Sequence, residues 1–100
     1  MAVLKKMTGE SAGQLIDLKA ETIVIGRDPT LSHIILGSNA VSRKHAEIRR
    51  SSDGYSLVDL NSRNKTKLNG NFVNPETPIV LASNDLINIC DFEFIFFPYR

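Results

Sequence analysis

The segment AEIRRSSDGYSLVDL, residues 46–60, has the pattern of a β-hairpin. Apolar residues at positions 46 and 48 alternate with charged residues at 47 and 49, which is the period of a strand with one buried face and one face in water. Asp53-Gly54 is a common tip for a tight hairpin, and the mainly apolar residues 55–60 form the returning strand. This segment therefore predicts a pair of antiparallel strands.

The rest of the chain repeats this pattern on both sides of the hairpin. Short apolar or alternating runs recur between turn signals such as Asp28-Pro29, and no segment keeps a helical period. Near the C-terminus, Phe92, Phe94 and Phe96 occupy alternate positions, which indicates a core strand. Ten strands are predicted, at residues 3–7, 14–18, 22–25, 33–36, 46–50, 55–60, 67–68, 79–81, 86–89 and 92–97. Many short strands with frequent turns indicate an all-β sandwich or barrel.

Composition limits the possible organisation and setting. The 100 residues suffice for one compact domain with its own core, but not for two. The single cysteine, Cys90, excludes a disulfide within the chain and favours a reducing, cytoplasmic setting. We expect no membrane span, because no apolar run approaches roughly 18 residues, and residues 1–7 lack a signal-peptide pattern. The net charge of +1 argues against nucleic-acid binding through bulk charge.

Three segments interrupt the strand pattern with polar and charged residues, at 26–32, 37–44 and 61–66. Loops at one end of a sandwich commonly carry function. Residues 43–67 hold seven basic and three acidic side chains, a net charge of +4 in a nearly neutral protein. This excess is either a set of solvated faces or a positive patch for an anionic ligand. Arginine, serine and asparagine are the residue types that bind a phosphate dianion and the peptide around it.

Three ordered blocks resemble the signature of forkhead-associated (FHA) domains. Gly26-Arg27 comes first, followed about fifteen residues later by Ser42-Arg43-Lys44-His45. The third block is DLNSRNKTKLNG, residues 59–70. The resemblance covers the whole chain. It implies a single FHA domain over residues 1–100, an antiparallel β-sandwich of about eleven strands. Domains of this family usually belong to larger proteins, of which this chain would be the N-terminal module.

The resemblance also implies a function, which is the binding of phosphothreonine-containing segments of partner proteins. Arg27, Ser42 and Arg43 match phosphate-contacting positions of the family. Arg63 and Asn64 match the pair that holds the peptide next to the phosphothreonine. The family prefers phosphothreonine to phosphoserine, because the additional methyl group fills a small pocket. No cofactor or metal is expected, and we expect the isolated domain to be monomeric.

Two other residues match architectural positions of the family, and one residue departs from its pattern. Gly26 and His45 are expected to shape the loops. Lys65 stands where the family has glycine. A left-handed conformation there would cost a lysine on the order of 1 kcal/mol, and the alternative is a different turn. The charges of Arg63 and Lys65 suggest a preference for acidic residues after the phosphothreonine.

The same residues argue against several other functions. Ser42, His45 and Asp59 superficially form a hydrolase triad, but no nucleophile-elbow sequence is present, and Asp59 is expected to fix the loop that follows it. His33, His45 and Cys90 lack the spacing of a metal site, and Cys90 is expected to be a buried apolar residue on a core strand. Nucleic-acid binding is disfavoured because most aromatic residues fall on the apolar phase of the strands. The remaining alternative is a phosphate-independent structural or self-association module on the same fold.

Overall fold

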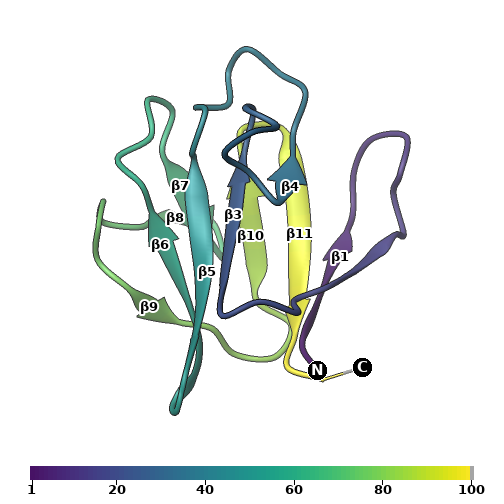
Figure 1. Cartoon of the computed structure of the whole chain (residues 1–100), viewed down its shortest axis with the longest axis vertical. Coiled ribbons are helices and arrows are strands. Elements are labelled where there is room, and N and C mark those ends of the chain that lie inside the picture. The colour runs from purple at the N-terminus through teal and green to yellow at the C-terminus, as the bar shows by residue number, and fades with distance from the viewer. Residues whose placement is uncertain (100) are drawn as a thin grey trace.

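In the computed structural model, which describes residues 1–99, two β-sheets pack face to face (Figure 1). The strand order is β2-β1-β11-β10-β7-β8 in one sheet and β4-β3-β5-β6-β9 in the other. The strands are β1 (Val3–Lys6), β2 (Leu15–Asp17), β3 (Thr22–Gly26), β4 (Ile34–Ile35), β5 (Ala46–Ser51), β6 (Gly54–Asp59), β7 (Thr66–Leu68), β8 (Asn71–Phe72), β9 (Ile79–Val80), β10 (Leu86–Ile89) and β11 (Phe92–Phe97). Among the described residues, no helix is long and apolar enough to cross a membrane.

The predicted β-sandwich is confirmed. All ten strands expected from the pattern are present, and each end differs from the prediction by at most one residue. The eleventh strand is β8, which pairs with β7 through Lys67↔Phe72 and Leu68↔Asn71. All strand pairs are antiparallel except β3–β4, which is parallel over only two residue pairs, Ile25↔Ile34 and Gly26↔Ile35.

The core lies between the sheets and follows the alternation of the strands. Phe94 and Phe96 of β11 are buried, as their spacing predicts, and each contributes about 1.5–3 kcal/mol by leaving water. Ile48 and Leu57 face them from the hairpin of the opposite sheet. Further buried core side chains are Leu4, Leu18, Ile25, Leu36, Ala46, Ile87 and Ile89. This packing fixes the ends of the strands from which the loops extend.

The expectation that Cys90 is a buried residue on a core strand is wrong. The residue lies in the two-residue turn between β10 and β11 and not on a core strand, and it is only partly buried. The φ of Cys90 is 54°. A positive φ is what the first central residue of a two-residue hairpin turn requires. Its thiol donates a hydrogen bond to the backbone carbonyl of Ala40, at 3.3 Å from Sγ to O.

Candidate functional site

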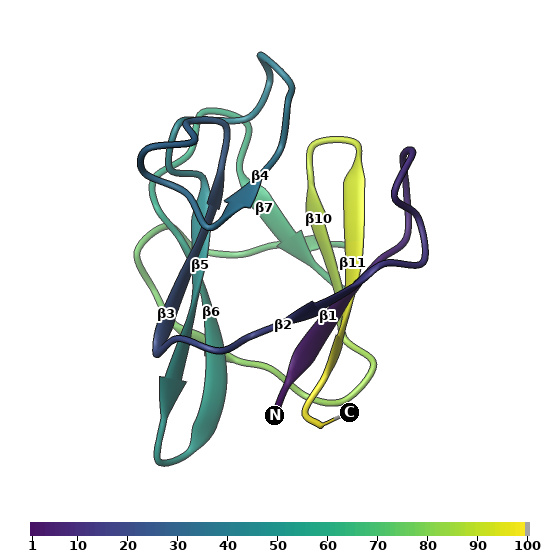
Figure 2. The same ribbon diagram turned by 45° about the vertical axis from the view of Figure 1, so that its right-hand side comes forward.

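The three loops singled out in the sequence meet at one end of the sandwich. They connect β3 to β4, β4 to β5, and β6 to β7, and Figure 2 shows them above the sheets, away from the two chain ends. Backbone bonds join the first two loops, since the N–H groups of Arg27 and Asp28 donate to the carbonyls of Ser42 and Arg43. The β6–β7 loop is joined to the β4–β5 loop by side chains described below.

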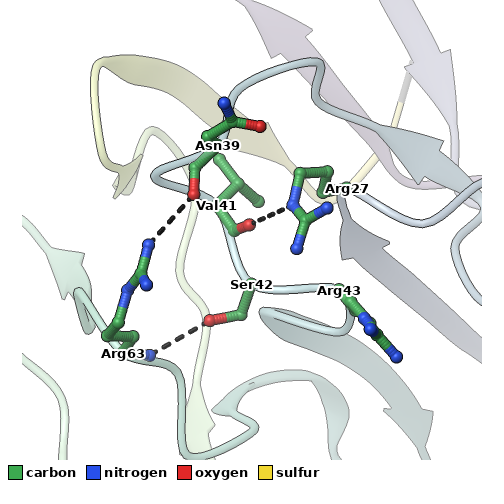
Figure 3. A pocket seen from close by; sticks show the side chains of 6 residues that line it. All are labelled: Arg27, Asn39, Val41, Ser42, Arg43 and Arg63. Carbon is green, nitrogen blue, oxygen red and sulfur yellow. Dashed lines mark hydrogen bonds between the residues drawn. The ribbon is translucent and has the colours of Figure 1, made fainter.

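A cavity of about 470 Å³ opens among these loops. Figure 3 shows the six residues that line it, which are Arg27, Asn39, Val41, Ser42, Arg43 and Arg63. Three of these side chains are arginines and none is a carboxylate. The cavity is therefore suited to an anion. Four of the five predicted binding residues line it, and the fifth, Asn64, follows Arg63 in the β6–β7 loop.

Arg27 is exposed at the end of β3 and is held by one hydrogen bond. Its Nε donates to the carbonyl of Val41 at 3.0 Å. Since the guanidinium carries five N–H donors in a planar fork, this bond fixes the side chain and leaves the two terminal amino groups for a ligand (Figure 3).

Gly26 precedes Arg27 and allows the loops to approach closely. A Cβ atom on Gly26 would lie 2.1 Å from the carbonyl oxygen of Arg43 and 2.7 Å from Oγ of Ser32. The requirement for glycine here is steric. It differs from the usual requirement of a turn, because Gly26 has no positive φ.

Ser42 lies between the loops and contacts the β6–β7 loop directly. Its Oγ accepts a hydrogen bond from the backbone N–H of Arg63 at 3.0 Å. A hydroxyl group that accepts a bond in this way still has its own proton to donate. Ser42 can therefore donate to an anion in the cavity while it holds Arg63 in place.

His45 is fully buried behind Ser42 and bonds to two loops at once. Its Nδ1 accepts from the backbone N–H of Ser42 at 3.0 Å, and its Nε2 lies 2.9 Å from the carbonyl oxygen of Lys65. Because a carbonyl can only accept, these partners assign the proton to Nε2 and the lone pair to Nδ1. Both ring nitrogens are thus engaged with backbone.

Asp59 ends β6 and organises the start of the β6–β7 loop. Its buried carboxylate accepts bonds from the backbone N–H of Ser62 at 3.1 Å, the hydroxyl of Ser62 at 2.5 Å and the hydroxyl of Thr66 at 2.7 Å. These bonds close the loop from one end to the other. The carboxylate forms no hydrogen bond with His45, and the ring of His45 bonds to the backbone of Ser42 and not to its hydroxyl. The contacts of a hydrolase triad are not formed.

The remaining residues of the β6–β7 loop bond to the β4–β5 loop. A terminal amino group of Arg63 donates to the carbonyl of Asn39 at 3.1 Å, and the side-chain amide of Asn64 donates to the carbonyl of Ala40 at 2.6 Å.

Lys65 has a φ of 63°. It adopts the left-handed conformation that glycine takes most easily, so the loop does not change its turn to accommodate lysine.

Asn39 and Val41 are the lining residues that the sequence analysis did not single out. Neither belongs to the quoted motifs, and Asn39 resembles any polar loop residue. The signal that could have identified them is their position in the polar segment 37–44, directly before Ser42. Among residues 1–99, no three histidine, cysteine, aspartate or glutamate side chains gather as metal ligands would.

The residues that the structure describes form a β-sandwich with no helix, and an arginine-lined cavity suited to an anion lies among the loops at one end. The chain belongs to the FHA domain family, because the family model described as FHA domain matches residues 23–90.

Two curated relatives match nearly all of the chain. The oxoglutarate dehydrogenase inhibitor of Corynebacterium jeikeium (strain K411) is 41% identical over 97 residues, which are 95% of this chain and 63% of that protein. The glycogen accumulation regulator GarA of Mycolicibacterium smegmatis is 37% identical over 97 residues, 95% of this chain and 58% of that protein. The chain thus spans about six tenths of the length of these relatives.

Solved structures agree with the fold along 99% of the chain. Mycobacterium tuberculosis EmbR, solved in complex with a low-affinity phosphopeptide, has a TM-score of 0.87 and 31% identity, covering 99% of this chain and 24% of that one. An FHA domain from a study of phosphothreonine-dependent interactions has a TM-score of 0.83 and 31% identity, covering 99% and 97%.

Proposed function

We propose that this chain is a recognition module that binds phosphothreonine-containing segments of partner proteins. The observation that carries the proposal is the cavity of about 470 Å³, in which Arg27, Arg43 and Arg63 surround the hydroxyl of Ser42 without a carboxylate among the lining residues. Such a site attracts an anion and offers it both charge and directed hydrogen bonds.

The donors match the chemistry of a phosphate group. A phosphothreonine carries about −1.5 to −2 charges and three acceptor oxygens. In the proposed complex, the terminal amino groups of Arg27 meet two oxygens and the hydroxyl of Ser42 donates to the third. Arg43 contributes charge from the same loop as Ser42. Asn64, whose amide donates to Ala40, is positioned to exchange that bond for one to the peptide backbone.

The relatives support the proposal. The protein EmbR was solved with a phosphopeptide, and another similar FHA domain was studied for phosphothreonine-dependent interactions. The names of two further relatives describe an inhibitor and a regulator. We place the present chain in the same kind of role, as the single FHA domain of a longer cytoplasmic regulator, monomeric when isolated.

The proposed module binds without catalysing a reaction. Ser42 and His45 are the residues from which a nucleophile and a base would be chosen, but the imidazole of His45 is buried and both ring nitrogens face backbone groups. A general base must reach the proton that it removes, and His45 does not reach the hydroxyl of Ser42.

A screen of the chain against paired phosphorylated and unphosphorylated threonine peptides tests the function. We expect binding only to phosphorylated members, and weaker binding when phosphoserine replaces phosphothreonine. Equal binding to both members of each pair would contradict the proposal and favour the phosphate-independent alternative.

A further inference from the structure

Another cavity, of about 230 Å³, opens between the two sheets at the side where β2 and β4 form their edges. Its lining residues come from both edge strands, with Ile16 on β2 and Ile34 and Ile35 on β4. None of the residues that line this edge cavity also lines the arginine-lined cavity. The edge cavity is therefore a separate site, which the proposed function does not use.

The base of the edge cavity is aliphatic. Ile34 and Leu36 are buried there, whereas Ile35 is 52% exposed beside them. An exposed isoleucine on an edge strand is a position that proteins usually protect, because the side chain and the unpaired strand both invite another chain to bind. The cavity is also smaller than the roughly 300–1,000 Å³ typical of small-molecule sites. Its size therefore suits the side chains of a docking segment better than a cofactor.

Three side chains at the edge cavity can donate hydrogen bonds. Lys6, Gln14 and His33 line it, and no carboxylate is among the lining residues. The ammonium group of Lys6 lies 5.7 Å from the centroid of the Phe92 ring, a contact that orients it. Among residues 1–99, Lys6 forms no salt bridge. Its positive charge is therefore available to an anion in the cavity.

The backbone fixes which nitrogen of His33 can donate. Nδ1 accepts a hydrogen bond from the backbone N–H of Val24 at 2.9 Å, so the proton of the neutral imidazole is on Nε2. The ring is exposed and lines the edge cavity, which leaves this N–H as a donor for a ligand. The side-chain amide of Gln14 adds further N–H donors. An aliphatic base bordered by a cation and directed donors matches a carboxylate that lies next to an aliphatic group.

We propose that the edge cavity is a docking site for an unphosphorylated segment of a partner protein, in which an acidic residue lies next to an aliphatic one. The aliphatic side chain packs against Ile34 and Ile35, and the carboxylate binds the ammonium group of Lys6 and the Nε2–H of His33. This inference does not depend on the proposed function, because the site needs no phosphate. A partner that also carries a phosphothreonine would be held at two places, and each contact would raise the local concentration of the other segment.

The experiment selects a phage-displayed library of random, unphosphorylated octapeptides on the wild-type chain. The affinity of the most enriched peptide is then measured for the wild type, for Lys6→Gln and for Ile35→Ser. Lys5→Gln and Val80→Ser are the matched controls. Lys5 is the neighbour of Lys6 on β1 but does not line the edge cavity, and Val80 is exposed on β9, at the opposite edge of the sheet that contains Ile35. Thermal unfolding checks that each variant is folded, and backbone-amide NMR locates the bound peptide.

We expect the enriched peptides to share an acidic residue next to an aliphatic one. Lys6→Gln should weaken binding about two- to fivefold, the range for an exposed ion pair, and the loss should shrink at high salt. Ile35→Ser should weaken binding at least about fivefold, because the peptide loses its apolar contact. Both control variants should bind like the wild type. The peptide should shift the amides of residues 33–36 and not those of Arg27 and Ser42.

The proposal is overturned if no sequence is enriched, if the enriched sequences lack acidic residues, or if Lys5→Gln and Lys6→Gln lose the same affinity. Shifts centred on Arg27 and Ser42 would also overturn it, because they would place the peptide in the arginine-lined cavity. Dimerisation of the wild type that Ile35→Ser abolishes would overturn it in favour of a second copy at this edge. Failure of the proposed function is seen separately, as the absence of phosphothreonine-peptide binding by the wild type, which Lys6→Gln and Ile35→Ser should leave unchanged.

Discussion

Nδ1 of His45 accepts a hydrogen bond from the backbone N–H of Ser42, so that a fully buried imidazole holds the residue whose hydroxyl faces the cavity. The same ring bonds through Nε2 to the carbonyl of Lys65 in the β6–β7 loop. One side chain therefore sets the positions of two loops that form the site. The geometry of the cavity therefore depends on a fully buried residue that does not line it.

Replacing His45 with alanine should destabilise the fold by about 2–4 kcal/mol. The change leaves a cavity and removes the partners of two backbone groups. Urea denaturation measures the loss. His33→Ala is the matched control, because His33 also accepts a backbone N–H, that of Val24, but is exposed. Equal losses in the two variants would contradict the structural role of His45.

Gly26→Ala should destabilise the fold by about 1–3 kcal/mol or more. The new Cβ would overlap the carbonyl oxygen of Arg43 and force the β3–β4 and β4–β5 loops apart. Gly37→Ala provides the control, since a Cβ on Gly37 meets nothing within 4 Å. Thermal and urea unfolding measure the stability of both variants. Equal stability of Gly26→Ala and Gly37→Ala would contradict the close approach of the two loops at Gly26.

Lys65→Gly should be more stable than Lys65→Ala by roughly 1 kcal/mol. Both variants remove the same charge, but only glycine adopts the positive φ of 63° without strain. Denaturant midpoints measure the difference. The opposite order of stability would show that the loop abandons the left-handed conformation when lysine is removed.

The thiol of Cys90 should react slowly with iodoacetamide in the folded protein. Burial, and then the charge of Asp91, raise the pKa of Cys90 above its ordinary value, so less reactive thiolate is present at a given pH. Alkylation rates measured against pH, folded and in urea, test this. The folded rate should rise at a higher pH than the unfolded rate, and coinciding profiles would contradict the burial.

Strands β7, β10 and β11 could be predicted because buried residues alternate along them with less buried ones. Strands β3 and β6 could be predicted because they are short, mainly apolar runs between turn residues. Strand β8 was missed because Asn71–Phe72 is too short to alternate, and its Phe72 is exposed over the ammonium group of Lys67, 4.8 Å from the ring centroid. The turn position of Cys90 was missed because an apolar residue beside a strand has the same pattern as one within it.

The site could be predicted as a set of residues, but not as an arrangement. The motifs identified Arg27, Ser42 and Arg63, since their residue types and order are visible in the chain. The attachment of Arg63 to the carbonyl of Asn39 depends on loops 24 residues apart, and backbone carbonyls carry no signal in a sequence. The parallel pairing of β3 and β4 likewise depends on the path of the chain between them.

Titration of Arg27→Ala with a phosphothreonine peptide that binds the wild type tests most directly whether Arg27 binds the phosphate group. Arg50→Ala is the matched control. Arg50 is also exposed, but it lies near the end of β5 that is farther from the loops of the site (Figure 1). We predict that Arg27→Ala weakens binding by about 1.5–3 kcal/mol or more, the range for a hydrogen bond to a charged group, with little change in stability. Arg50→Ala should bind like the wild type. Unchanged affinity in a folded Arg27→Ala protein would contradict the assignment of the phosphate site.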